Sequence, residues 1–289
     1  MKQFLKDAGL TLGAFIVLVI IVDMWGPHSA NAYSYKRGYW DKHAAEIETL
    51  VMGHSLAEVG IDASVFGERA WCSAISGRQI YYDMKLLEHY LPQMECLKTV
   101  VLPLHPNICA YPRFDTLTEV GRNRVYAYYR YFGITTDTLP YGLLYRSAIF
   151  SDHFNYHAFT RNEYNEYGNM PMSRIYDGKR DKENFPVLFD IDRCIVYLIT
   201  MADMLAPRGI RFIVVTPPCA DTLLKECPLE NELALQAIAD SVNRHSLMEY
   251  HNYLHDPEFR NDSLYWDWVH LNSPGGTLFA QRIKADFGL

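Results

Sequence analysis

Short apolar runs and longer, periodically apolar stretches alternate along most of the chain. The runs short enough to be buried strands are residues 47–52, 71–75, 97–104, 210–216 and 247–253. The stretches with the length and spacing of helices are residues 79–91, 187–206, 229–245 and about 272–286. Strands that alternate with helices of this length favour an α/β fold, a three-layer sandwich around a mostly parallel, flavodoxin-like sheet.

Three of the predicted strands end in turns of polar residues, glycine or proline. These turns follow Met52, Leu104 and Thr216. Because ligands bind beyond the carboxyl ends of the strands in parallel sheets, these turns are the expected place for a functional site.

A tyrosine-rich region at about residues 111–168 interrupts the alternation. It holds about half of the 21 tyrosines of the chain, and we interpret it as a mostly helical insertion that covers one end of the sheet. Its tyrosines are expected to pack helices onto the sheet. Stacking on sugar rings is the alternative, because a tyrosine offers an apolar face with a polar tip.

The first 32 residues have the pattern of a membrane anchor or a signal peptide. Lys2 and Lys6 precede an uncharged run, residues 8–22, that would span roughly 22 Å as a helix. This is shorter than the ~30 Å hydrocarbon core of a bilayer, although Trp25 can extend the helix to the interface. The triplet Ala30-Asn31-Ala32 suits signal peptidase. Both interpretations place residues 33–289, the main domain, outside the cytoplasmic membrane, whereas a buried helix of a soluble protein is a third possibility.

Composition narrows the classes of partner. The net charge is -7 and the sequence contains no basic run, so we expect no nucleic-acid partner. The chain has no C-x-x-C pair and no His/Cys cluster with zinc spacing, and we expect neither a metal nor a cofactor. The six cysteines permit disulfides in an oxidising compartment, and Cys219 with Cys227 would close a short loop. Buried free cysteines are the alternative.

Two short segments at opposite ends of the main domain carry candidate chemistry. Gly53-His54-Ser55 directly follows a predicted strand, so Ser55 would be lifted clear of the sheet with its own N–H able to stabilise an oxyanion. Asp267 and His270 lie three residues apart in a predicted turn before the last helix. At this spacing the carboxylate can contact one imidazole nitrogen and leave the other free as a general base.

These two segments together resemble the SGNH/GDSL hydrolase superfamily. Asp267-x-x-His270 followed by Leu271-Asn272, a glycine and a terminal helix is similar to the last sequence block of that superfamily, and Gly53-His54-Ser55 is similar to its first. The resemblance implies a serine esterase with Ser55, Asp267 and His270 as catalytic residues. His54 stands where the superfamily usually has Asp.

The resemblance also implies an oxyanion hole. By position, Gly77 matches the glycine of the second superfamily block, and Asn107 falls where the third block has its asparagine. The backbone N–H groups of Ser55 and Gly77 and the side chain of Asn107 would then bind the oxyanion. The Gly and Asp that flank this asparagine in the superfamily are absent here. His54 and His105 are weaker candidates for contacts with substrate, and solvent-facing turn histidines are the alternative.

The order of anchor, Gly-x-Ser motif, insertion and late Asp-x-x-His is similar to membrane-tethered SGNH-like proteins of bacterial envelopes, relatives of alginate and teichoic-acid acylation proteins. This likeness implies an esterase or O-acyltransferase that acts on an envelope polysaccharide or glycoconjugate, with a membrane-bound acyltransferase as a possible partner. A scaffold or glycan-binding protein of the same fold without turnover is the alternative from another class.

Overall fold

The computed structural model describes residues 1–25, 31–105, 119–135, 164–179, 191–225, 229–244 and 248–289. The chain forms two compact units. One, which we call the N-terminal unit, comprises Met1–Tyr39 with Phe114–Asn162. The other, which we call the sheet unit, comprises Trp40–Arg113 with Glu163–Leu289 and contains all the strands described below.

Five parallel strands form the centre of the sheet unit. They are β1 (Thr49–Val51), β2 (Ala70–Cys72), β3 (Thr99–Pro103), β4 (Arg211–Thr216) and β5 (Met248–Asn252). Their spatial order is β2-β1-β3-β4-β5, which is the flavodoxin-like order. Every residue of β2 and β3 is buried. Strands of a parallel sheet that is covered on both faces are apolar along their whole length.

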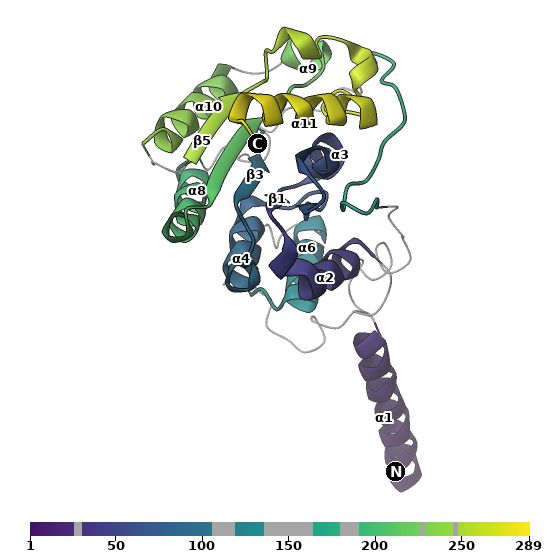
Figure 1. Ribbon diagram of the computed structural model, residues 1–289. Coiled ribbons are helices and arrows are strands. Elements are labelled where there is room, and N and C mark those ends of the chain that lie inside the picture. The colour runs from purple at the N-terminus through teal and green to yellow at the C-terminus, as the bar shows by residue number, and fades with distance from the viewer. Residues whose placement is uncertain (26–30, 106–118, 136–163, 180–190, 226–228, 245–247) are drawn as a thin grey trace. The chain divides into compact units, whose positions relative to one another are not determined.

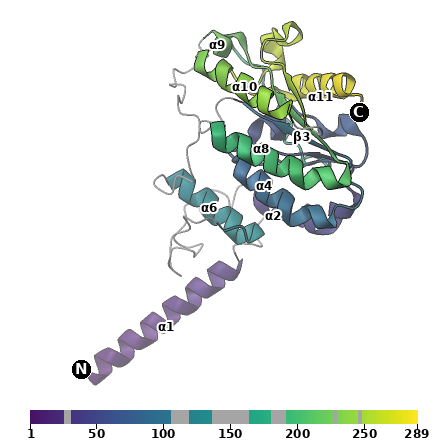
Figure 2. The same cartoon turned by 90° about the vertical axis from the view of Figure 1, so that its left-hand side faces the viewer.

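Helices cover both faces of this sheet (Figures 1 and 2). The helices α4 (Ile80–Tyr90), α8 (Ile191–Leu205) and α10 (Leu229–Val242) pack side by side on one face. On the other face α11 (Ser273–Phe287) packs against α3 (Ser55–Gly60). The fold class predicted from the sequence, an α/β sandwich with a parallel sheet, is therefore confirmed.

Several shorter elements are also present. They are α2 (Ala32–His43), α9 (Asp221–Leu224) and the 3-10 turns η2 (Ala44–Glu46), η3 (Ala63–Phe66), η4 (Leu91–Gln93), η6 (Ala206–Arg208), η7 (Pro257–Phe259) and η8 (Asp262–Leu264). The chain passes from β1 to β2 on one side and then to β3 on the other side of β1. The carboxyl ends of β1 and β3 therefore form the switch point at which ligands bind in such sheets.

The described part of the tyrosine-rich insertion contains the helix α6 (Glu119–Phe132), which belongs to the N-terminal unit. Tyr131 stacks on Tyr33 with 5.6 Å between ring centroids, and Tyr128 meets Tyr33 edge to face at 5.4 Å. The hydroxyl of Tyr131 also accepts a hydrogen bond of 2.6 Å from Asn31. These tyrosines therefore pack α6 against the start of α2. Residues 136–163 of the insertion lie outside the described residues.

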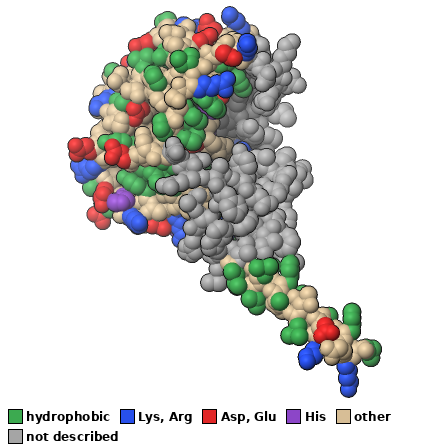
Figure 3. Space-filling model, turned by 90° about the vertical axis from the view of Figure 1, so that its right-hand side faces the viewer, with side chains coloured by type: hydrophobic (Ala, Val, Ile, Leu, Met, Phe, Trp, Pro, Cys, Tyr) green, Lys and Arg blue, Asp and Glu red, His purple; other side chains and the backbone are tan. Residues whose placement is uncertain are grey.

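The chain begins with α1 (Lys2–Trp25), a 24-residue helix. At about 1.5 Å per residue it is ~36 Å long, because the helix includes residues on both sides of the uncharged run. Its side chains are mostly hydrophobic, with blue and red charged side chains near one end (Figure 3). Lys2, Lys6 and Asp7 lie in its first two turns. Within the described residues it is the helix long and apolar enough to cross a membrane, a test that a signal sequence also passes.

Candidate active site

Ser55 is the first residue of α3 and follows β1 by way of a tight turn. The residue before it, His54, is the N-cap of α3: its backbone is extended, and its Nδ1 atom accepts a hydrogen bond of 3.4 Å from the N–H of Leu56. The His54 carbonyl accepts the N–H groups of Ala57 and Glu58. The turn therefore starts a helix at the carboxyl edge of the sheet, and Ser55 lies at that edge.

The structure brings Ser55, His270 and Asp267 into one hydrogen-bonded chain. His270 Nε2 lies 2.7 Å from Ser55 Oγ, and His270 Nδ1 lies 2.8 Å from Asp267 Oδ2. An ionised carboxylate can only accept, so Nδ1 carries the proton and Nε2 is left to accept the Ser55 hydroxyl proton. The side chains of His270 and Asp267 are 20% and 28% exposed, so a substrate can reach them from solvent.

The second carboxylate oxygen of Asp267 stabilises the turn between Asp267 and His270. Asp267 Oδ1 accepts the backbone N–H groups of Val269 and His270 at 2.8 and 2.7 Å. Burial by itself raises the pKa of Asp267, but the hydrogen bond and charge of His270 and these N–H groups outweigh it, and the pKa lies below its ordinary value. Asp267 is therefore a carboxylate at neutral pH, and its position relative to the imidazole is fixed by the turn.

The segment after His270 explains why Asn272 and Gly275 follow it. Asn272 caps α11, since its side-chain oxygen accepts the N–H of Gly275 at 3.1 Å, and its Nδ2 donates to the carbonyls of Ser263 and Tyr265. A Cβ atom on Gly275 would lie only 2.1 Å from the carbonyl oxygen of Leu264. Asparagine and glycine are therefore needed to close the loop that carries the histidine onto the last helix.

Two of the three oxyanion-hole candidates lie within the described residues. The backbone N–H of Ser55 donates to no group in the described part of the chain. Gly77 lies in a turn over residues 75–78, closed by a 3.0 Å hydrogen bond from the N–H of Arg78 to the carbonyl of Ile75. The φ angle of Gly77 is +72°, as the third residue of a type II turn requires. Asn107 lies outside the described residues.

The two histidines considered for contacts with substrate are both buried. His54 is 7% exposed and acts as the helix cap described above. His105 follows β3 and is 3% exposed. Burial and, to a smaller extent, the charge of the nearby His270 lower its pKa from 6.5 to about 3. At neutral pH His105 is therefore an uncharged imidazole close to His270. Nothing in the structure tests a contact of either histidine with substrate, so both contacts stay predictions.

Several known structures share this arrangement of the chain, although no protein-family model and no curated protein matches the sequence. The chain is similar to a Streptococcus pneumoniae protein assigned as a platelet activating factor, at 10% identity and a TM-score of 0.49 over 96% of this chain and 98% of that chain. It is also similar to a GDSL-like lipase from Bacteroides thetaiotaomicron, at 12% identity and a TM-score of 0.45 over 89% of this chain and 98% of that chain.

A third similar structure is a catalytic mutant of an acetylxylan esterase from Geobacillus stearothermophilus, at 14% identity and a TM-score of 0.39 over 85% of this chain and 95% of that chain. The likeness ends with the fold.

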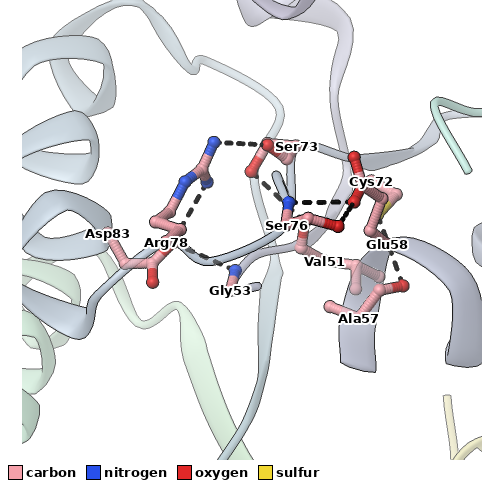
Figure 4. Close-up of polar contacts among 9 residues, drawn as sticks. All are labelled: Val51, Gly53, Ala57, Glu58, Cys72, Ser73, Ser76, Arg78 and Asp83. Atoms are coloured by element: carbon pink, nitrogen blue, oxygen red, sulfur yellow. Dashed lines mark hydrogen bonds and ion pairs between the residues drawn. The ribbon is translucent and has the colours of Figure 1, made fainter. Parts of the chain in front are cut away.

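Sequence reasoning missed a buried polar network beside the site (Figure 4). Asp83 Oδ1 accepts the N–H of Gly53 at 3.0 Å and an Arg78 N–H at 3.1 Å, and Arg78 also donates to the Ser73 carbonyl at 2.7 Å. On the other side of the same loop, Glu58 Oε2 accepts both the N–H and the hydroxyl of Ser76. The sequence feature that could have indicated this network is one acidic residue, Glu58, among the apolar residues that follow Ser55.

Within the described residues no group of three or more His, Cys, Asp or Glu side chains could hold a metal ion. Cys72 and Cys219 are buried, and Cys96 is partly exposed. Cys227, the partner considered for Cys219, lies outside the described residues, and so does Cys109.

Proposed function

We propose that the protein is a serine acyl-ester hydrolase or O-acyltransferase with Ser55 as nucleophile, His270 as general base and Asp267 as the group that orients the imidazole. The observation that carries this proposal is the pair of hydrogen bonds, 2.7 Å from Nε2 to Ser55 Oγ and 2.8 Å from Nδ1 to Asp267 Oδ2. Nucleophile, base and orienting carboxylate within this reach are the arrangement that acyl transfer requires.

In the first step Ser55 Oγ attacks the acyl carbon while its proton passes to His270 Nε2. The negative charge on the carbonyl oxygen is then bound by the N–H groups of Ser55 and Gly77, with the Asn107 side chain as the third donor. Collapse of the tetrahedral species breaks the bond to the leaving alcohol, and His270 returns the proton to that oxygen. The product of this step is an acyl ester of Ser55.

In the second step an oxygen nucleophile attacks the acyl carbon of this acyl-enzyme, and His270 takes its proton. The bond between the acyl carbon and Ser55 Oγ then breaks, and His270 returns the proton to Ser55 Oγ. Water gives a hydrolase and a free acid. A sugar hydroxyl gives a transferase and a new ester. The transfer reaction would need an acyl donor, and a membrane-bound acyltransferase is the partner that we expect to supply it.

The location and the substrate class are also part of the proposal. The helix α1 carries Lys2 and Lys6 at its amino end, and positive residues stay on the cytoplasmic side of a membrane. We infer from this orientation that the sheet unit lies outside the cytoplasmic membrane, either tethered by α1 or released after cleavage near Ala32. We propose acylated envelope polysaccharides or glycoconjugates as substrates, the class that the sequence resemblance implies.

Labelling with a fluorophosphonate tests the reaction. The full-length protein in detergent micelles is treated with the probe, and the modified peptide is found by mass spectrometry. We expect modification of Ser55, and no modification in Ser55→Ala or His270→Ala. The matched control is Ser263→Ala, a change of an exposed serine in the loop before Asp267, which should label like the wild type.

Turnover is followed in parallel with p-nitrophenyl acetate. The Ser55→Ala variant should lose at least about 10³-fold in kcat/KM. A wild-type protein that neither labels at Ser55 nor hydrolyses the ester would refute the proposed reaction. That result would leave a scaffold or glycan-binding protein with the same fold as the alternative.

A further inference from the structure

The carboxylate of Glu58 is a buried polar group that the proposed reaction does not use. Glu58 lies three residues after Ser55 in α3, and it is 0% exposed. Its Oε2 atom accepts the N–H of Ser76 at 2.9 Å and the hydroxyl of Ser76 at 2.5 Å, while its Oε1 atom accepts the hydroxyl of Tyr164 at 2.6 Å. Each carboxylate oxygen is therefore committed to a specific partner.

Burial of the Glu58 side chain carries a cost in free energy. Transfer of a carboxylate from water into a protein interior is unfavourable unless hydrogen bonds replace its hydration, and an apolar side chain of the same size usually serves stability as well or better. The three hydrogen bonds to Glu58 satisfy the charge, but a methionine would fill the same volume without needing them. The position of the carboxylate therefore points to a role in fixing its partners.

The main partner is the turn that carries Gly77. Ser76 precedes Gly77, and the orientation of the peptide between them decides where the Gly77 N–H points. Glu58 binds the N–H of Ser76, which belongs to the preceding peptide, and also the Ser76 hydroxyl (Figure 4). These two contacts fix the residue from which the Ser76–Gly77 peptide starts. On the other side of Gly77, Arg78 is held by Asp83.

The same loop is tied to the turn that carries Ser55. The N–H of Ile75 donates to the Gly53 carbonyl at 3.3 Å, and the N–H of Gly53 donates to Asp83 at 3.0 Å. Glu58 belongs to the helix that begins at Ser55. The nucleophile and the Gly77 turn are therefore linked through short, buried contacts.

We propose that Glu58 is a positioning residue, which holds Ser76 so that the N–H of Gly77 faces the oxygen on which negative charge develops during acyl transfer. This inference rests on the proposed function, because it assigns a role within the oxyanion hole of that reaction. Glu58 touches neither the substrate nor the reacting atoms and acts through the turn. Its removal is expected to weaken binding of the transition state more than binding of the substrate.

The test compares Glu58→Met with Glu58→Gln in the full-length protein. Methionine fills the site but cannot accept from Ser76, whereas the amide oxygen of glutamine can. For p-nitrophenyl acetate we expect Glu58→Met to lose about 10- to 100-fold in kcat with KM within about twofold of the wild type. The affinity for a boronic acid, whose serine adduct places an oxygen in the oxyanion hole, should fall by the same factor. Glu58→Gln should recover most of both losses.

Tyr164→Phe is the matched control, because it removes the other hydrogen bond to Glu58 and leaves those from Ser76. It should keep kcat and boronic-acid affinity within about threefold of the wild type. The proposal is overturned if Glu58→Met keeps the wild-type kcat, or if its kcat falls while the boronic-acid affinity does not.

Two further results also decide the role of Glu58. If Glu58→Met does not fold, Ser76→Ala removes only the hydroxyl contact. A joint loss of about three- to tenfold in kcat and boronic-acid affinity then supports the proposal, and no loss overturns it. If the wild type shows no turnover that depends on Ser55, the proposed function fails and the role of Glu58 fails with it. A normal wild type with an unaffected Glu58→Met variant overturns the positioning role alone.

Discussion

We predict that the buried pair of Arg78 and Asp83 makes the free energy of unfolding depend on pH. Burial raises the pKa of Asp83 from its ordinary value of 3.8 to about 6, although the charge and hydrogen bond of Arg78 and the Gly53 N–H act in the opposite direction. Because the pKa of this acid is higher in the folded protein than in the unfolded chain, the folded state favours the protonated form. Its contribution to the free energy of unfolding is full below pH 3.8 and is lost as the pH rises through 6.

The magnitude follows from the size of the shift. One pKa unit corresponds to about 1.4 kcal/mol, so a rise from 3.8 to about 6 corresponds to roughly 3 kcal/mol between pH 3 and pH 7. The perturbation is Asp83→Asn, which has nearly the same shape and does not titrate. The free energy of unfolding of the wild type minus that of Asp83→Asn should therefore decrease by about 3 kcal/mol over this range.

The assay is urea unfolding of the full-length protein in micelles, followed by tryptophan fluorescence at several pH values. Other acids titrate in both proteins and cancel in the difference. Arg78→Met is the companion variant, because it leaves the Asp83 carboxylate buried without its cation, and it should cost about 3–5 kcal/mol at pH 7. A difference between wild type and Asp83→Asn that increases from pH 4 to pH 7 would refute the reasoning, since the attraction of Arg78 would then outweigh burial.

Two further changes concern the loop that carries the histidine. Asp267→Asn should lower kcat on the order of 10³- to 10⁴-fold with intact folding, because an amide can donate to Nδ1 and favour the wrong imidazole tautomer. Steady-state kinetics with p-nitrophenyl acetate measure kcat, and an unchanged value would rule out the orienting role of Asp267. Gly275→Ala should destabilise the protein by about 1–3 kcal/mol, because the added Cβ overlaps the Leu264 carbonyl. Urea unfolding measures this loss, and an unfolding midpoint equal to that of the wild type would contradict the close contact between Gly275 and Leu264.

Much of the fold was predictable because the strands are buried on both faces. The run at residues 97–104 contains β3, Thr99–Pro103, and the run at 210–216 contains β4, Arg211–Thr216. A central strand of a parallel sheet is apolar at most positions, so it is visible as a nearly continuous run. The run at 71–75 was less accurate, since β2 spans Ala70–Cys72 and therefore begins one residue earlier and ends three residues earlier.

The site was predictable only where its residues lie close together in sequence or follow a strand. Asp267 and His270 are three residues apart, and Ser55 directly follows the first strand. The contacts of Glu58 could not be predicted, since Tyr164 lies 106 positions away and no periodicity connects the two. The capping role of His54 was also hidden, because histidine is not among the residues that usually cap helices.

The charges around His270 are arranged so that this imidazole can accept a proton. Protonation of His270 in the transition state is favoured by a negative neighbour and opposed by a positive one. Asp267 supplies the negative neighbour and lies in contact with Nδ1. His105 would be a positive neighbour if it carried a proton, but its burial keeps its pKa near 3 and its ring neutral. A neutral His105 therefore does not oppose the positive charge that His270 takes up when it accepts the proton of Ser55 in the proposed reaction.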